Sequence, residues 1–553
     1  MTVLRQSVQS SLLVSAFAGG LSVAALAQGQ LAAVDKVFAD FNAPDRPGCA
    51  VAVSEGGTEL FARAYGMADL EHGIPNTPAT VFEPGSVSKQ FTAAATILLA
   101  LDGKLSLNHD VREYIPELPD YGETITIRHL LNHTSGLRDW GSVAGIEGWP
   151  RTTRVHTHTH MLDIASRQKS LNYSPGEYYS YTNTGYNLQA VLVERVSGMS
   201  FAEFSRVRIF EPLGMTKTEW RDDFTRIVKD RAVAYSRTRD GAYRMNMPFE
   251  NVHGNGGLLT TVSDLLRFTH NLETGELGGP EFLKEMHTQG VLNSGRTIQY
   301  ASGLFIDQYK GIREVQHSGG TAGYRGFLTR FPDHGVAVAV MCNNGSANAG
   351  GLAHQVADLF LGAAIASDEA APSTPPAVAV PADRLEPVVG SYKSTRDQRL
   401  MGRITIRDDQ LLFGNQALTP LSETRFRIGT SGSAIEFDTD FEGPRPGAVL
   451  TRPDGDVLRL EPVADFDPSA SDLDEYTDAY HSEEAEVTYW FEVREEALTR
   501  VDRYGDSAPL RPAYPDAFSG PGGFYIFHRD AGQVTGVSFV QSRVWDLRFE
   551  RVP

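Results

Sequence analysis

The first part of the chain has strand-like runs at its two ends and helix-like periodicity between them. Residues 49–66 consist of two apolar runs around a Glu-Gly-Gly turn, which predicts a β-hairpin. Three further strand-like runs lie at 313–320, 324–331 and 335–344, the last two separated by a Pro-Asp-His turn. We therefore predict an α+β domain whose single antiparallel sheet is built from both ends of the segment, with helices packed on it.

The composition changes after a helix-like segment at 349–366. Residues 367–384 are rich in Ala, Pro and acidic side chains, which is typical of an extended linker. Two segments of short alternating strands follow, 385–465 and 470–553. They share a spacing offset by 88 residues, in which Leu385, Tyr392 and Ser394 correspond to Leu473, Tyr480 and Ser482. This pattern predicts two related all-β modules, each a small barrel.

The first residues have the features of a secretory signal peptide. Residues 1–27 contain the early Arg5, an apolar stretch from Leu12 to Leu26 and a small-x-small ending at Ala27. A membrane anchor is the alternative, but the apolar stretch is short and interrupted by glycine. We expect cleavage after Ala27, a first domain at 28–366, a periplasmic or secreted location and no membrane span in the mature chain.

The net charge and the cysteine content reduce the number of protein classes to which the chain could belong. The net charge of −19 and the absence of a basic, aromatic-rich run exclude a nucleic-acid partner. The two cysteines, Cys49 and Cys342, are too few for a disulfide scaffold or a thiolate zinc site. They would lie side by side if their two strands paired antiparallel, and an oxidising compartment would then permit a disulfide bond between them. Because the register of the strands cannot be read, we favour two separate buried core residues.

The strongest local motif is the Ser86-Val87-Ser88-Lys89 segment. A Pro-Gly pair precedes it and an apolar helical pattern follows, which predicts that Ser86 lies at the N-terminus of a buried helix. Free backbone N–H groups there favour a developing anion. Lys89 is one turn further on, and a desolvated lysine can lose its proton and activate a serine hydroxyl. The alternative is a capping serine beside a solvated lysine.

Two other segments carry candidate chemistry. Tyr181-Thr182-Asn183 is predicted in a loop just before a helix, where the alternative reading is that Asn183 or Thr184 caps the helix and Tyr181 packs. His317-Ser318-Gly319-Gly320 is predicted at a strand end, where bare glycines allow a substrate backbone to approach. The alternative reading of that segment is a tight turn with a surface histidine.

The ordered set SVSK, YTN and HSG resembles the three active-site motifs of the penicillin-binding protein and β-lactamase superfamily, in its class C and DD-peptidase branch. Further landmarks such as FEPGSVSKQFTA, IRHLLNHTSGLRDW and HSGGTAGYRGF extend the resemblance over roughly residues 30–365. It implies a serine hydrolase domain with an antiparallel sheet flanked by helices, acting on a small-molecule or peptide substrate, including one derived from peptidoglycan. The implied chemistry requires no metal or other cofactor.

The resemblance also implies a role for each motif residue. Ser86 is acylated, Lys89 takes its proton, Tyr181 relays the proton to the leaving group and Asn183 holds the substrate amide. The backbone N–H groups of Ser86 and Gly320 form the oxyanion hole, and His317, Ser318 and Gly319 complete the substrate-binding strand.

One departure limits what the substrate can be. Many relatives have lysine where this chain has His317, and a neutral histidine does not supply the permanent cation that pairs with a substrate carboxylate. This weakens the case for efficient β-lactam hydrolysis without removing it, so β-lactams stay candidates beside D-amino-acid peptides, amides and esters. A carboxylesterase and a non-catalytic peptidoglycan-binding member are the alternatives.

The tail is similar to that of bacterial D-aminopeptidases, in which two small lipocalin-like barrels follow the catalytic domain and a loop of the last barrel reaches the active site. We predict that residues 503–523 form this loop, since they are rich in Pro and aromatic residues.

A run of alternating histidines, His156, His158 and His160, offers a third class of function. On a strand the three side chains would share one face and could chelate a metal. We favour a lid that is exposed and runs into a helix, because no nearby carboxylate or cysteine completes a metal site.

Overall fold

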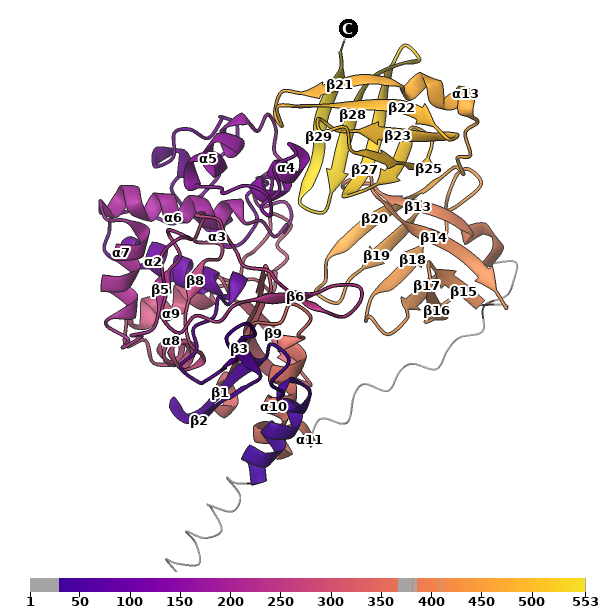
Figure 1. Ribbon diagram of the computed structural model, residues 1–553. Helices are drawn as coiled ribbons and strands as arrows, with labels where there is room; N and C mark the ends of the chain where they lie inside the picture. Colours follow the sequence, from indigo (N-terminus) through magenta and orange to yellow (C-terminus); the bar gives the residue numbers. More distant parts are fainter. Residues whose placement is uncertain (1–28, 367–379, 381–384, 409, 553) are drawn as a thin grey trace, which may run out of the picture.

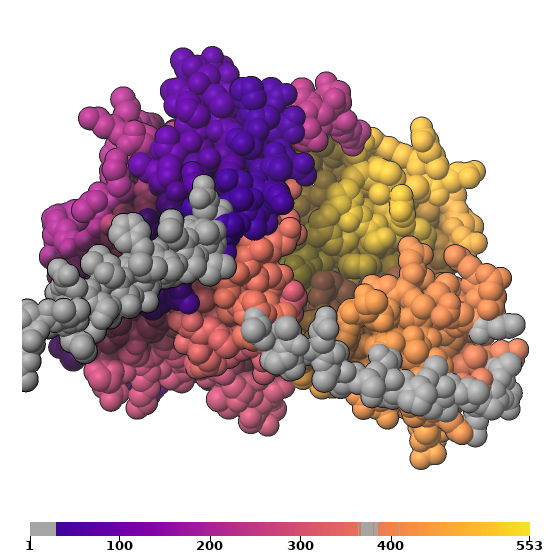
Figure 2. Space-filling view, turned by 90° about the horizontal axis from the view of Figure 1, so that it is seen from below, coloured from indigo at the N-terminus to yellow at the C-terminus, as the bar shows by residue number. Residues whose placement is uncertain are grey.

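The computed structural model describes residues 29–366, 380, 385–408 and 410–552. The predicted signal peptide at 1–27 lies outside the described residues, as does nearly all of the predicted linker at 367–384. The described chain comprises a mixed helix and sheet domain followed by two β modules, which lie next to each other against one flank of that domain (Figures 1 and 2). The α+β fold class with two following β barrels is thus confirmed.

The first domain is organised around one antiparallel sheet made from both ends of the segment, as predicted. Its strand order is β2-β1-β12-β11-β10-β9. The strands are β1 (Cys49–Glu55), β2 (Thr58–Tyr65), β9 (Phe305–Tyr309), β10 (Ile312–Thr321), β11 (Tyr324–Phe331) and β12 (Val336–Cys342). Because β1 pairs directly with β12, the first hairpin and the last three strands form one continuous surface.

Helices cover both faces of this sheet, which explains why its central strands are apolar along their whole length. Ala50 and Ala52 of β1 face the large core around helix α2 (Lys89–Leu101), whereas Val51 and Val53 face a second core under α10 (Ala349–Leu361). A strand buried on both faces loses the usual polar alternation.

The remaining elements of this domain are short helices and two-stranded ribbons. The helices are α3 (Ile127–Leu131), α4 (Trp140–Ile146), α5 (His158–Arg167), α6 (Thr184–Ser197), α7 (Phe201–Ser205), α8 (Val262–Thr274), α9 (Gly279–His287) and α11 (Ala363–Ala366). The ribbons pair β3 (Met67–Asp69) with β4 (Ile74–Pro75), β5 (Glu219–Trp220) with β8 (Leu258–Leu259), and β6 (Tyr235–Arg237) with β7 (Tyr243–Met245). Among the described residues, no helix is both long and apolar enough to cross a membrane.

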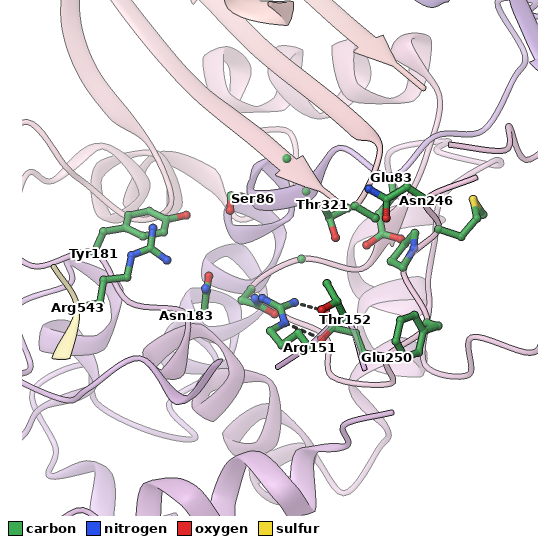
Figure 3. Close-up of a pocket in the computed structure, with 18 of the residues that line it drawn as sticks. Glu83, Ser86, Arg151, Thr152, Tyr181, Asn183, Asn246, Glu250, Thr321 and Arg543 are labelled. Atoms are coloured by element: carbon green, nitrogen blue, oxygen red, sulfur yellow. Dashed lines mark hydrogen bonds and ion pairs between the residues drawn. The ribbon is translucent and has the colours of Figure 1, made fainter. Parts of the chain in front are cut away.

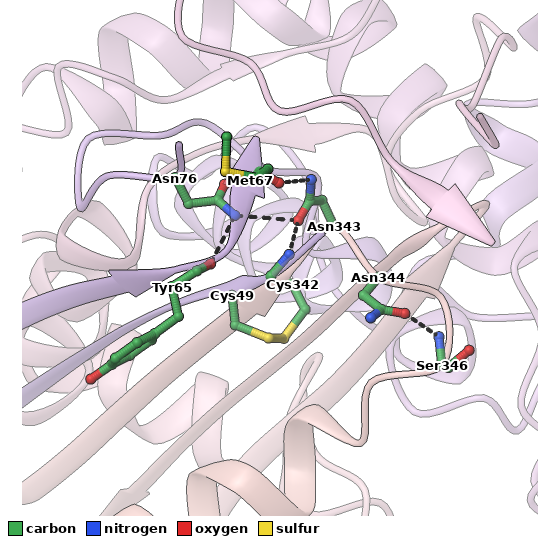
Figure 4. The surroundings of a disulfide bond; sticks show 9 residues. Cys49, Tyr65, Met67, Asn76, Cys342, Asn343, Asn344 and Ser346 are labelled. Carbon is green, nitrogen blue, oxygen red and sulfur yellow. Dashed lines mark hydrogen bonds between the residues drawn. A yellow bond between two sulfur atoms is a disulfide. The ribbon is translucent and has the colours of Figure 1, made fainter. Parts of the chain in front are cut away.

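Cys49 and Cys342 form a disulfide, so the expectation of two separate buried cysteines is wrong. The two residues are direct partners in the β1–β12 register, with their Cα atoms 3.9 Å apart (Figure 4). Next to the bridge, Asn343 accepts a hydrogen bond from the Gly48 amide (2.9 Å) and donates one to Met67 O (3.0 Å). The register that brings the cysteines together is set by packing on both faces of the sheet, which sequence alternation did not reveal.

The first β module is a closed barrel of eight strands. They are β13 (Gly390–Ser394), β14 (Leu400–Arg407), β15 (Gln410–Phe413), β16 (Gln416–Pro420), β17 (Arg425–Ile428), β18 (Ala434–Phe437), β19 (Ala448–Thr451) and β20 (Val457–Val463). Closure leaves no unpaired sheet edge, because β13 pairs with both β14 and β20.

The second β module is a sheet of nine strands in the order β24-β23-β22-β21-β29-β28-β27-β26-β25. A short helix, α13 (Ala470–Leu473), precedes it. The strands are β21 (Asp478–Ser482), β22 (Val487–Arg494), β23 (Ala497–Val501), β24 (Ser507–Pro509), β25 (Arg511–Tyr514), β26 (Ala517–Gly520), β27 (Gly523–Asp530), β28 (Gln533–Gln541) and β29 (Val544–Arg551).

The repeated spacing of the two modules has a structural counterpart. Tyr392 lies on β13 and donates a hydrogen bond to Val388 O (3.0 Å), and Tyr480 lies on β21 and donates one to Tyr476 O (3.1 Å). In each module a buried tyrosine therefore ties the first strand to the turn that precedes it.

Candidate active site

Ser86 lies on a tight turn that leads into the buried helix α2. The turn is a 3₁₀ helix, η2 (Gly85–Ser88), and α2 begins at Lys89, which confirms the predicted position of Ser86 before a buried helix. Gly85 has φ of +57°, and a Cβ atom there would lie 2.5 Å from the Gly320 nitrogen. Only glycine therefore lets this turn pack so closely against strand β10.

Lys89 is fully buried, so the alternative of a solvated lysine is wrong. Its Nζ lies 3.1 Å from Ser86 Oγ, 3.0 Å from Asn183 Oδ1 and 2.7 Å from Asn255 O. A neutral amine has two N–H donors and one lone pair. The amide and carbonyl oxygens can only accept, so they take the two N–H groups and leave the lone pair to face the Ser86 hydroxyl.

The electrostatics of the site favour this neutral form. Burial holds the pKa of Lys89 well below its usual value. The positive charge of Arg543 lowers that pKa further, while Asp139 acts in the opposite direction. Lys89 is thus a neutral base candidate beside a serine hydroxyl.

Tyr181 and Asn183 approach the same point from the loop before α6. The Asn183 side chain does not cap the helix but contacts Lys89, and its backbone N–H donates to Asp139 Oδ2 (2.7 Å). The Tyr181 hydroxyl points toward Ser86 and has no hydrogen-bond partner among the described residues (Figure 3). Burial raises the pKa of Tyr181, so its phenol carries a proton.

His317 is buried on β10 and is held in its neutral form. Its Nδ1 lies 2.6 Å from Ser318 O, which can only accept, so Nδ1 carries the proton and Nε2 accepts from the Tyr300 hydroxyl (3.1 Å). Burial is the main cause that lowers the pKa of His317 to about 3. The surface-histidine alternative is wrong, because the residue is only 2% exposed.

Strand β10 presents a free edge to the Ser86 turn. Its pairing with β9 ends at Gln316, whereas its pairing with β11 continues to Thr321. A Cβ atom at Gly319 would lie 1.9 Å from Pro84 O and 2.7 Å from the Ser86 nitrogen, so the strand can approach only as glycine. The residues from His317 to Gly320 therefore line the site, as predicted.

Ser86, Tyr181 and Gly320 border two adjoining cavities. The first cavity, of about 610 Å³, extends past Asn183 toward Arg151, Asn246 and Glu250 (Figure 3). The second cavity, of about 620 Å³, follows β10 past Tyr179 and Phe305 toward Arg325 and the start of α10. A substrate bound across both would present its scissile bond to Ser86 between them.

Arg543 borders both cavities and was not anticipated. It lies at the tip of the β28–β29 hairpin of the second module, with its guanidinium 5.0 Å from the centre of the Tyr181 ring (Figure 3). The predicted loop at 503–523 is a wrong assignment, because those residues form β24 to β26 and the start of β27 and line neither cavity. The aromatic residues Tyr514 and Phe518 of this segment are buried within the module. A lone arginine in a hairpin turn offers no comparable sequence signal.

The supporting residues of the site were also missed. Asp139, Asn255 and Tyr300 contact Asn183, Lys89 and His317 respectively. Asp139 lies in the segment HTSGLRDW, whose resemblance to family landmarks was the available signal. The contact from Asn255 is made by a backbone carbonyl, which no residue type encodes.

The histidine run begins helix α5, as favoured, and does not form the strand that chelation would need. His156 is only 1% exposed, so the expectation of an exposed segment is wrong at that residue. His156 Nε2 contacts Trp149 O (2.9 Å) and His158 Nε2 contacts His253 O (3.0 Å). Within the part of the chain that the structure describes, the one cluster of three metal-type side chains is Asp69, Glu71 and His72.

Comparison with known proteins gives relatives along most of the chain. It is 31% identical over 320 residues to penicillin-binding protein 4* of Bacillus subtilis, an alignment that covers 53% of this chain and 67% of the relative. It is 27% identical over 525 residues to a D-aminopeptidase of Gluconobacter oxydans, covering 92% of this chain and 96% of the relative. The second alignment includes both β modules.

Solved structures show the same fold at lower identity. The octameric penicillin-binding protein homologue from Pyrococcus abyssi has a TM-score of 0.55 and 24% identity, covering 78% of this chain and 99% of its own. The D-amino acid amidase from Ochrobactrum anthropi, complexed with L-phenylalanine amide, has a TM-score of 0.52 and 24% identity, covering 61% and 99%. The β-lactamase family model matches residues 34–361, and the chain therefore belongs to the β-lactamase family of serine hydrolases.

Proposed function

We propose that this protein hydrolyses D-amino-acid-containing peptides, amides or esters through an acyl-enzyme on Ser86. The observation that carries the proposal is the arrangement of Lys89, whose two N–H groups are taken by Asn183 Oδ1 and Asn255 O while its lone pair faces Ser86 Oγ. A buried neutral lysine in this position is suited to accept the serine proton.

The acylation step follows from these positions. Ser86 Oγ attacks the substrate carbonyl carbon while its proton passes to Lys89 Nζ. The backbone N–H groups of Ser86 and Gly320 stabilise the oxyanion, a contribution of about 3 kcal/mol per donor in comparable sites. Tyr181 passes its proton to the leaving nitrogen or oxygen as the scissile bond breaks and takes up the proton held by Lys89, and Asn183 orients the substrate amide.

Deacylation uses the same groups in reverse order. As water attacks the acyl carbon, Tyr181 relays one of its protons to Lys89; the bond to Ser86 Oγ then breaks and Lys89 returns this proton to Oγ. Each group ends in its starting state, so the cycle consumes only substrate and water.

Two observations support a peptide-like substrate. The free edge of β10 from His317 to Gly320 can pair with an extended backbone. The alignment with a D-aminopeptidase over 92% of the chain favours D-configured substrates and makes D-aminopeptidase the more specific alternative. His317 is neutral and supplies no cation on this strand.

Labelling with a fluorescent fluorophosphonate tests the nucleophile. We expect one adduct on Ser86 by peptide mass spectrometry, its loss in Ser86→Ala, and normal labelling in the control Ser166→Ala on the exposed side of α5. An unlabelled wild-type protein would favour the alternative of a non-catalytic peptidoglycan-binding member.

A substrate panel then tests the specificity. It contains nitrocefin, a D-Ala-D-Ala peptide, p-nitrophenyl butyrate and the D and L forms of alanine p-nitroanilide. We expect the D form to be cleaved faster than the L form. Equal rates for the two enantiomers, with the butyrate fastest, would identify a carboxylesterase instead.

We also propose that the mature protein begins at Gln28 and functions in the periplasm or outside the cell. The signal-like residues 1–27 and the Cys49–Cys342 disulfide both suit an oxidising compartment. N-terminal sequencing of protein recovered from a periplasmic extract tests this; an intact Met1 on that protein would contradict it.

A further inference from the structure

Arg543 is the one part of the site that a different module supplies, and its backbone is firmly held. Arg543 O accepts hydrogen bonds from the Asp139 amide (3.3 Å) and from Asn172 Nδ2 (3.2 Å). Asn172 Oδ1 also accepts from the Trp545 amide (2.8 Å), and Arg138 donates to Trp545 O (3.1 Å). The hairpin is thus held at Arg543 itself and at Trp545.

The guanidinium of Arg543, in contrast, has spare donors. Its closest carboxylate is that of Asp139 at 3.9 Å, and this carboxylate already accepts a short hydrogen bond from the Asn183 amide. No hydrogen bond from the Arg543 side chain to another described residue is found, and the side chain is 39% exposed. A guanidinium has five N–H donors in a planar fork, which suits a carboxylate.

The second cavity has no negative charge of its own. Among the described residues, its lining includes two arginines, Arg325 and Arg543, and no Asp or Glu. The Arg325 guanidinium lies beside Gly320, next to the edge of β10. His317, on the same wall, is neutral.

The first cavity contains carboxylates, but arginines already hold them. Glu83 receives hydrogen bonds from Arg221 at 2.9 and 3.0 Å, and Glu250 receives one from Arg151 at 2.6 Å. Glu83 and Glu250 are 1% and 4% exposed, respectively. Neither cavity therefore offers an unpaired carboxylate to the free α-ammonium that an aminopeptidase substrate carries.

We propose that Arg543 is a specificity residue that binds a carboxylate of the substrate beside Ser86 and that selects against substrates with a free α-ammonium. The chain would then combine the domain order of its aminopeptidase relatives with the opposite charge preference. This inference rests on the proposed hydrolase function, and it concerns only which substrates Ser86 receives.

Matched p-nitroanilides test the proposal on the full-length protein. D-alanine p-nitroanilide carries an ammonium, its N-acetyl form is neutral and its N-succinyl form carries a carboxylate on the acyl side. An N-acetyl-D-alanyl ester of 3-hydroxybenzoate, compared with the phenyl ester, carries the carboxylate on the leaving group. We expect kcat/KM to rise from ammonium to neutral to at least one of the two carboxylate substrates.

Arg543→Gln should reduce the carboxylate-to-neutral ratio of kcat/KM by about 10- to 100-fold, the range for a lost hydrogen bond to a charged group. Arg543→Glu should invert the order of the ammonium and carboxylate substrates. Arg511→Gln, an exposed arginine on β25 of the same module, is the matched control and should leave the ratio unchanged.

Several results would overturn the proposal. One is a wild-type enzyme that prefers the ammonium substrate, and another is a charge ratio that Arg543→Gln does not change. If none of the substrates is cleaved, the proposal is tested by how well ligands protect Ser86 from labelling by the fluorophosphonate. N-succinyl-D-alanine must then protect Ser86 better than D-alanine amide does. The reverse order refutes the proposal. If Ser86 is not labelled at all, the hydrolase function itself is contradicted. This outcome is therefore distinct from a failure of the Arg543 proposal.

Discussion

The first strands of the two β modules, β13 and β21, start at matching positions and bury matching tyrosines, yet the modules relate to the site in different ways. The first module is a closed barrel that touches the first domain through Arg296 and Asp456 (3.1 Å). The second sends its β28–β29 hairpin between the two cavities and shares one continuous core with the first domain. Two similar scaffolds thus differ in function through one hairpin and its docking.

The largest loss of activity is expected from a substitution in the first domain, at a residue that neither β module supplies. Lys89→Ala removes the proposed base from the first domain, and acylation should slow by about 10²–10⁴-fold, the range for general-base catalysis. Stopped-flow measurement of the p-nitroaniline burst checks this. A normal burst would mean that the reacting groups are not those of the first domain alone.

Docking of the second module should affect stability far more than docking of the first. Arg138→Met leaves Glu484 buried without its cation and removes bonds to Trp545 O and Asp546 O, a loss of about 3–5 kcal/mol. Arg296→Gln breaks a partly exposed pair with Asp456, which is worth about 0–1 kcal/mol. Thermal melts of the two variants compare these losses, and equal shifts would remove the distinction between the modules.

The second module should also influence the pH dependence of catalysis. The charge of Arg543 helps to lower the pKa of Lys89, and the proposed base must be neutral to accept the serine proton. Activity therefore rises as pH increases through the pKa of Lys89, and Arg543→Gln should move this acidic limb to higher pH. The measurement is kcat/KM against pH on the neutral N-acetyl substrate. A limb that stays in place would mean that the two cations do not interact.

The smallest expected effect is a loss of stability that tests whether the repeated tyrosine contact has the same structural role in both β modules. Tyr392→Phe and Tyr480→Phe each remove one buried hydrogen bond, at a cost of about 1 kcal/mol. Hydrogen exchange followed by mass spectrometry should show faster exchange in the variant's own module only. Loss of protection in both modules at once would show that they unfold as one unit.

Several features were predictable because they depend on local patterns. The six-stranded sheet was anticipated except for β9, and the three motifs do meet at Ser86. Alternation and periodicity report burial. Gly85 was expected only to stop the chain before the helix and Gly319 only to admit a substrate backbone, whereas the structure shows that both allow the Ser86 turn to pack on β10. The tyrosine spacing of the two modules likewise survives as a repeated contact.

The remaining features depend on contacts between distant parts of the chain. The rest of the first domain and the whole first β module lie between Tyr181 and the module that carries Arg543, and only docking brings the two residues together. The Cys49–Cys342 pairing depends on register, and the contact from Asn255 to Lys89 uses a backbone oxygen. None of these is encoded by a local residue pattern.

The pairing of β1 with β12 has a consequence for the order of folding. β1 is complete at Glu55, but its partner ends at Cys342, so the sheet cannot close until nearly the whole domain has been synthesised. Contacts this distant in sequence make folding slow. If the chain is exported unfolded, β1 crosses the membrane first and stays unpaired until β12 has also crossed. The Cys49–Cys342 bond can then form only after the whole first domain has been exported.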